Sequence, residues 1–161
     1  MNNIQSGGKI WLIIVGKSML PYLIDGDKVL IQGEDFENLK CGDIITYRIN
    51  NEYFTHRIIK KLDTTLLTKG DHLYLPDNYI DINSIIGKVI AIDKKNKLID
   101  LNQKKYRIIN RCIGNLQKIV GILNLYISSK FVSALGQKAT SMIFKISNLF
   151  IYLVERILIC G

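Results

Sequence analysis

The apolar residues of this chain follow two different periods, and the change between them constrains the fold more than any other feature. Up to about residue 102, short apolar runs alternate with turn residues such as Gly, Asn and Asp. Such runs are typical of strands, whereas the apolar residues beyond them recur at helical spacing. We therefore expect a mainly β fold, with a small coiled all-β domain at residues 9–102 and a helical appendage at residues 103–161.

The predicted strands are placed by their β-branched and aromatic residues and by the turns between them. Asn50-Asn51 and Asp63-Thr64 mark two turns, and residues 93–97 look like the tip of a further hairpin. The predicted strands are Ile10–Val15, Lys28–Gln32, Asp43–Ile49, Tyr53–Leu62, Thr65–Thr68, Ile85–Ile92 and Leu98–Leu101.

Two amphipathic helices are predicted at the C-terminal end, with a break at Gly136-Gln137 or nearby residues. The second, at residues 142–160, has about the length of a membrane span, but Lys145, Glu155 and Arg156 would be costly in hydrocarbon. Three alternatives remain open for it: a span, a helix in the membrane interface, or packing on the β domain. The sequence favours the interfacial helix.

The charge of the chain indicates an anionic partner. The formal net charge is +8, and 48% of the residues are hydrophobic. A basic chain favours nucleic acid or an anionic membrane surface. Because no nucleic-acid-binding motif is visible, we expect an anionic membrane surface as partner and a membrane-associated protein, bound peripherally or through its C-terminal helices. The cysteines, Cys41, Cys112 and Cys160, lack the spacing of a zinc site and predict reduced thiols.

Residues 16–32 are the stretch around which we expect function to be organised. An apolar run ends at Gly16, and Ser18 follows where the chain must turn. Pro21 restricts the backbone of the turn, and Asp25-Gly26-Asp27 is typical of a tight turn before the next strand. A serine on a stiff turn between two strands can be held toward a substrate.

Four short motifs, in order, resemble the type I signal peptidase family. They are Ser18-Met19-x-Pro21 with Gly26-Asp27, then Gly42-Asp43-Ile44-Ile45-Thr46-Tyr47, then Thr55-His56-Arg57-Ile58-Ile59, and then Thr68-Lys69-Gly70-Asp71 with Asp77 and Ile86-Gly87-Lys88-Val89. Bacterial-type members of this family carry Lys-Arg where this chain carries His56-Arg57, whereas the ER-type and archaeal-type members carry His-Arg. The resemblance covers residues 10–92 and implies the ER-type or archaeal-type branch.

The resemblance implies a serine endopeptidase that cleaves a signal or leader peptide after small residues. Ser18 would be the nucleophile and His56 the general base, because an imidazole titrates near neutral pH. An Asp would orient the imidazole. Asp71 and Asp77 both remain open for this role, with Asp77 slightly favoured and Asp71 able instead to hold the loop. No metal or organic cofactor is implied.

The oxyanion hole and the substrate groove are expected around Gly16, Met19 and Pro21. The backbone N–H of Ser18 is the expected oxyanion donor. Many family members have a second Ser where this chain has Gly16, so one donor is either lost or supplied by the backbone. The family binds its substrate as an added strand, and Met19 with residues 10–15 would line the groove.

Two other functions remain open. The scaffold could bind peptides without cutting them, and Gly16, Lys17 and His72 are departures from the family pattern that favour this reading. His72 is also a rival base, expected at the surface. A LexA-like self-cleaving regulator shares the serine-containing fold, but it needs a Lys base and a DNA-binding module. The residues ahead of Ser18 leave no room for that module or for the family's usual membrane anchor, so the C-terminal helices are expected to make the membrane contact.

Overall fold

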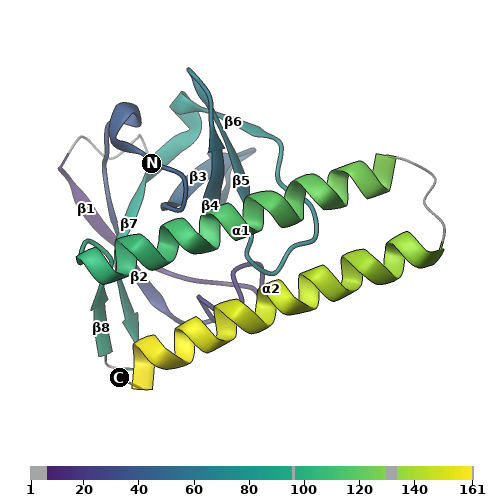
Figure 1. Cartoon of the computed structure of the whole chain (residues 1–161). Coiled ribbons are helices and arrows are strands. Elements are labelled where there is room, and N and C mark those ends of the chain that lie inside the picture. The colour runs from purple at the N-terminus through teal and green to yellow at the C-terminus, as the bar shows by residue number, and fades with distance from the viewer. Residues whose placement is uncertain (1–6, 96, 130–133, 161) are drawn as a thin grey trace.

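The computed structural model describes residues 7–95, 97–129 and 134–160, which form an antiparallel sheet of eight strands followed by two helices (Figure 1). The predicted mainly β fold with two C-terminal helices is confirmed. In chain order the elements are β1 (Lys9–Ile13), β2 (Lys28–Gln32), the 3-10 helix η1 (Phe36–Asn38), β3 (Ile44–Ile49), β4 (Glu52–Lys61), β5 (Thr65–Lys69), β6 (Tyr79–Asp81), the 3-10 helix η2 (Ile82–Ser84), β7 (Ile85–Lys94), β8 (Lys97–Asp100), α1 (Lys104–Ser129) and α2 (Ala134–Cys160).

The order of strands in the sheet is β1-β2-β7-β3-β4-β5-β6, and β8 pairs with β7. Every strand predicted from the sequence is present, with bounds that differ by no more than two residues. Asn50 and Asn51 have φ angles of 48° and 66°, as a tight hairpin turn requires. The prediction missed β6, a three-residue strand that pairs with β5, because so short a segment has no measurable alternation.

The two helices run antiparallel to one another beside the sheet (Figure 1). α1 ends at Ser129 and α2 begins at Ala134. Gly136 and Gln137, near which the break was predicted, therefore lie inside the first turn of α2. In the part of the chain that the structure describes, neither helix combines the length and the apolar composition needed to cross a membrane.

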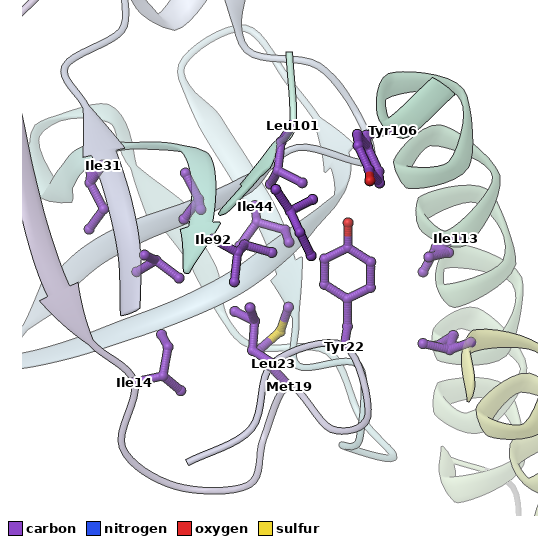
Figure 2. Close-up of a cluster of buried hydrophobic side chains, with 14 residues drawn as sticks. Ile14, Met19, Tyr22, Leu23, Ile31, Ile44, Ile92, Leu101, Tyr106 and Ile113 are labelled. Carbon is purple, nitrogen blue, oxygen red and sulfur yellow. The ribbon is translucent and has the colours of Figure 1, made fainter. Parts of the chain in front are cut away.

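One core cluster joins the turn that carries Ser18 to the sheet and to both helices (Figure 2). Met19, Tyr22 and Leu23 of the turn are buried in it, together with Tyr106 and Ile113 of α1. Burying a side chain of this size contributes about 1.5–3 kcal/mol. The helices therefore share a core with the sheet, and the division at residues 102 and 103 stays a prediction.

α1 lies directly against the backbone just before β3. A Cβ atom placed on Gly114 would lie 2.6 Å from Gly42 Cα, and one placed on Gly42 would lie 2.5 Å from the carbonyl oxygen of Asn110. Both separations are shorter than real Cβ atoms show, so glycine at both positions lets the helix approach the strand. The glycine of the Gly42-Asp43 motif thus serves the contact with α1.

We expect Gly114→Ala to lower the free energy of unfolding by about 1–2 kcal/mol, because the added methyl group overpacks the contact with Gly42. This loss should appear although alanine favours a helix over glycine by about 1 kcal/mol. Urea unfolding of the variant against the unchanged protein measures the difference. Asn115→Ala, at an exposed position of the same helix, is the control and should be near neutral. A Gly114→Ala variant as stable as the control would contradict the close approach.

Candidate active site

Ser18 lies in the turn that follows β1, and hydrogen bonds within this turn hold it in place. The Gly16 N–H donates to Asp25 Oδ1 at 2.8 Å, and the Leu23 N–H donates to the carbonyl oxygen of Met19 at 2.9 Å. The side chains of Met19 and Leu23 are buried in the core. The turn is therefore held by hydrogen bonds of its backbone and by side chains that are buried in the core. Ser18 itself stays half-buried at the surface.

Ser18, His56 and Asp77 form a continuous chain of hydrogen bonds. His56 Nε2 lies 3.0 Å from Ser18 Oγ, and His56 Nδ1 lies 2.7 Å from Asp77 Oδ2. The His56 side chain is buried in β4, whereas that of Asp77 is partly exposed. In this arrangement a histidine can take the proton of a serine hydroxyl while a carboxylate orients the imidazole.

Asp77 is held by two further side chains that the sequence did not single out. Thr68 Oγ1 donates to Asp77 Oδ2 at 2.6 Å, and Tyr47 Oη donates to the same oxygen at 3.1 Å. Burial raises the pKa of Tyr47 well above its usual value, so its hydroxyl remains a donor. Both residues belong to the motifs quoted above, and this membership was the sequence feature that could have identified them as part of the site.

Asp71, the other candidate partner of His56, instead binds Arg57. Arg57 Nε and Nη2 donate to the two carboxylate oxygens of Asp71 at 2.9 and 2.7 Å, and both side chains are fully buried. Successive residues of a strand point to opposite faces, so His56 and Arg57 lie on opposite sides of β4. The structure thus brings Asp77 to His56 and leaves Asp71 on the other face.

The loop after β5 is tied to the turn that carries Ser18. The His72 N–H donates to the carbonyl oxygen of Ser18 at 2.8 Å. A Cβ atom placed on Gly70 would lie 2.6 Å from that same oxygen, so glycine permits this approach. The His72 side chain, considered above as a rival base, is exposed, and its ring lies 6.1 Å from that of Phe144 in α2.

An open groove with a volume of ≈ 580 Å³ runs beside Ser18 and His56. Residues 12–15 line one side of it and residues 52–56 of β4 line the other. Gly16 and Met19, which were expected to shape the groove, are among its lining residues, but Pro21 is not. The peptide bond before Pro21 is cis, and beyond Met19 the chain turns inward, so that Tyr22 and Leu23 enter the core.

The groups beside the groove suit acyl transfer, in which a nucleophile, a base and an oxyanion donor must meet. Ser18 supplies both a hydroxyl and a backbone N–H, and His56 is within hydrogen-bond reach of the hydroxyl. Among the residues that the structure describes, no three His, Cys, Asp or Glu side chains come together as a metal ion would require.

Lys69 at the end of β5 is a buried base that faces α1. Its Nζ donates to Gln117 Oε1 at 2.6 Å and to the carbonyl oxygen of Gly70 at 3.2 Å. Burial lowers the pKa of Lys69 to about 8, and the charges of Asp71 and Asp77 offset part of that effect. Lys69 therefore supports the loop after β5 from the side opposite to the groove residue His56.

The sequence of this chain is similar to those of known proteins. The sequence model of the family described as Peptidase S24-like matches residues 2–90. Over 71 residues the chain is 38% identical to proteins named "Inactive signal peptidase IA" from Staphylococcus aureus strains Mu50 / ATCC 700699 and COL. Each match covers 43% of this chain and 41% of the relative, so the chain spans about two fifths of the length of the curated relatives it matches.

We expect Asp71→Asn to lower the free energy of unfolding by about 3–5 kcal/mol, because it leaves the buried Arg57 guanidinium without its anionic partner. Urea unfolding measures the change. Asp63→Asn, which alters an exposed turn residue in the same chemical way, should be close to neutral. Similar stabilities for the two variants would show that the ion pair does not support the fold.

The lowered pKa of Lys69 predicts a pH dependence of stability. Between about pH 8 and pH 10 the unfolded chain keeps a proton on Lys69 that the folded chain has released. The unchanged protein should therefore gain stability over Lys69→Met by up to about 1.4 kcal/mol per pH unit in this range, and not below it. Unfolding in urea at several pH values tests this, with Lys28→Met at an exposed position as control. A difference independent of pH would contradict it.

Proposed function

This chain belongs to the Peptidase S24-like family, and from that premise we propose that it is a signal-peptidase-like serine endopeptidase that cleaves signal or leader peptides after small residues. The observation that carries the proposal is the chain of hydrogen bonds from Ser18 Oγ through His56 to Asp77 beside an open groove. Such a chain is what nucleophilic attack by a serine hydroxyl requires.

In the proposed reaction Ser18 Oγ attacks the peptide carbonyl carbon while His56 Nε2 takes the hydroxyl proton. His56 then gives this proton to the amine that leaves as the peptide C–N bond breaks, which forms the acyl-enzyme on Ser18. A water molecule, deprotonated by His56, attacks the acyl-enzyme, and His56 returns this second proton to Ser18 Oγ as the ester bond breaks and the acid product leaves. Asp77 accepts the hydrogen bond from His56 Nδ1 and stabilises the imidazolium. Thr68 and Tyr47 donate to Asp77 Oδ2 and so hold this carboxylate in place.

The oxyanion would be stabilised by the backbone N–H of Ser18. Gly16, at the position where many relatives carry a second serine, offers no hydroxyl. Its own N–H is already donated to Asp25 Oδ1. We therefore infer that the site works with fewer oxyanion donors than those relatives, which would reduce the rate while leaving the mechanism unchanged.

The groove suits an extended peptide because strand edges border it. β5 pairs with β4 from Arg57 onward, so in the described sheet residues 52–56 of β4 pair with β3 alone. β1 pairs with β2 and has no second neighbour among the described strands. A peptide lying between these edges could bond to their backbone groups, as in strand addition, with side-chain pockets giving specificity.

The comparisons show the family and not its ER-type or archaeal-type branch, so we infer that branch from the dyad of His56 with Ser18. Lys69 is a buried lysine on the neighbouring strand, but it donates to Gln117 and Gly70 and takes no place beside Ser18. His56 is therefore the base that the geometry favours.

A second candidate function is peptide binding without cleavage. The matched relatives carry the word "inactive" in their names, and Gly16, Lys17 and His72 depart from the family pattern. The same groove would then hold a peptide, and Ser18 would make no covalent bond to it.

We expect the protein to cleave leader peptides that carry Ala at the two small-residue positions recognised just before the cleavage site. Ser18→Ala or His56→Ala should abolish this cleavage. Asp77→Asn should reduce the rate by about 10³- to 10⁴-fold, because the imidazole loses its orienting carboxylate. The cleavage reaction is run in detergent or with liposomes, and its products are identified by mass spectrometry. Asp63→Asn, at an exposed turn, should cleave at the unchanged rate.

The outcomes separate the two candidates. Tight binding of these peptides without cleavage by the unchanged protein would establish the peptide-binding function instead. Cleavage that survives His56→Ala would mean that His56 is not the base.

A further inference from the structure

The excess positive charge of the chain lies entirely in its helical segment. Residues 1–103 contain 13 Lys and Arg and 13 Asp and Glu, so that part is neutral. Residues 104–161 contain nine Lys and Arg and a single acidic residue, Glu155, and so account for the whole net charge of +8. A surface with this charge attracts anionic partners over a distance.

One face of α2 exposes a stripe of large apolar side chains. Their exposed fractions lie between 42% and 63%, and their spacing places them within about 100° of the helix circumference. This apolar stripe consists of Met142, Ile146, Leu149, Phe150 and Leu153. The opposite face of α2, with Phe144, Ser147 and Ile151, is the buried one.

A row of cations borders the apolar stripe. Lys138, Lys145 and Arg156 are all exposed, and at 100° per residue they lie within about 20° of one another on the helix circumference. The stripe and this cationic border together form a surface that is apolar in the middle and positive along one edge. α1 adds further exposed positive charge at its beginning, with Lys104, Lys105, Arg107 and Arg111.

We propose that the apolar stripe of α2 and its border of Lys138, Lys145 and Arg156 dock on an anionic lipid surface. A helix that lies in the membrane interface combines an apolar face, which enters the boundary between headgroups and acyl chains, with cations that contact anionic headgroups. Lys145 stands near the middle of α2, where it would be costly in hydrocarbon. The helix therefore lies in the plane of the membrane.

Charge favours lipid over a second copy of the chain as the occupant of this surface. Two copies meeting through the same face would bring together two helical segments that each carry eight net positive charges. Their repulsion opposes such a dimer, whereas anionic headgroups neutralise the charge.

Docking would also hold the candidate active site near the lipid surface. Phe144, on the buried face of α2, stacks on Tyr74 with ring centroids 3.9 Å apart, and Tyr74 belongs to the loop that carries Asp77. If the proposed peptidase function holds, this helix places the site where a membrane-bound precursor would present its cleavage site. The lipid docking itself rests on charge and exposure alone.

The test is cosedimentation of the full chain with vesicles made of equal parts phosphatidylglycerol and phosphatidylcholine, compared with vesicles of phosphatidylcholine. We expect binding to the anionic vesicles that weakens as salt is added. Lys138→Gln combined with Lys145→Gln and Arg156→Gln should reduce partition by about 100-fold, because each cation near an anionic surface contributes about fivefold. The matched control combines Lys9→Gln, Lys28→Gln and Arg48→Gln, exposed positions of β1, β2 and β3, and should bind nearly as the unchanged protein does.

A second variant tests the apolar stripe. Ile146→Ser with Leu149→Ser alters exposed side chains and leaves the core intact, and it should also weaken vesicle binding. Equal binding by the Gln variant of α2 and its control would overturn the proposal. The proposal would also be overturned if the unchanged protein were a dimer, the Ser variant were a monomer, and neither protein bound vesicles. Cleavage of a soluble peptide at the unchanged rate by the α2 variants would show that the lipid surface is separate from the peptidase site.

Discussion

The buried ion pair of Arg57 and Asp71 is the contact on which the arrangement of the site depends. Taking two charges out of water costs several kcal/mol per ion, and the cost is offset here because the guanidinium also donates to the Gly42 carbonyl and to Asn110 Oδ1. These partners come from β4, from the loop after β5, from the segment before β3 and from α1. His56 adjoins Arg57 in β4, and Asp77 follows Asp71 in the same loop, so the pair that joins these segments also fixes the separation of His56 and Asp77.

α1 supports the site through polar side chains on its buried face. Asn110 accepts from Arg57, and seven residues later Gln117 donates to the carbonyl oxygen of Asp71 while accepting from Lys69. After seven more residues, Asn124 Nδ2 donates to the carbonyl oxygen of Tyr74. Two of these three side chains, Gln117 and Asn124, donate to the loop that carries Asp71 and Asp77, so the helix is part of the framework of the site.

The sequence predicted the features that depend on neighbouring residues, such as strands and turns. It did not predict the contacts between segments that lie far apart in the chain. Strands and turns follow from local patterns, and the motifs single out Ser18 and His56 as a pair, but the choice between Asp71 and Asp77 depends on which face of β4 each one meets. The structure exposes two apolar residues of α1, Cys112 and Ile119. It buries polar residues instead, because segments far away in the sequence satisfy their hydrogen bonds. A local sequence pattern cannot predict such distant hydrogen-bond partners.

The loop between β5 and β6 therefore lies between two kinds of support. On one side Thr68, Tyr47 and His56 fix Asp77 by hydrogen bonds, and on the other side α2 meets the loop through the stack of Phe144 on Tyr74. An aromatic pair of this kind contributes about 0.5–1.5 kcal/mol beyond its buried area. A displacement of α2 that broke it would change the equilibrium constant between the observed loop arrangement and others by about two- to tenfold. A displacement of α2 can thus change the position of Asp77 through the contact of Phe144 with Tyr74, without any residue of α2 entering the groove.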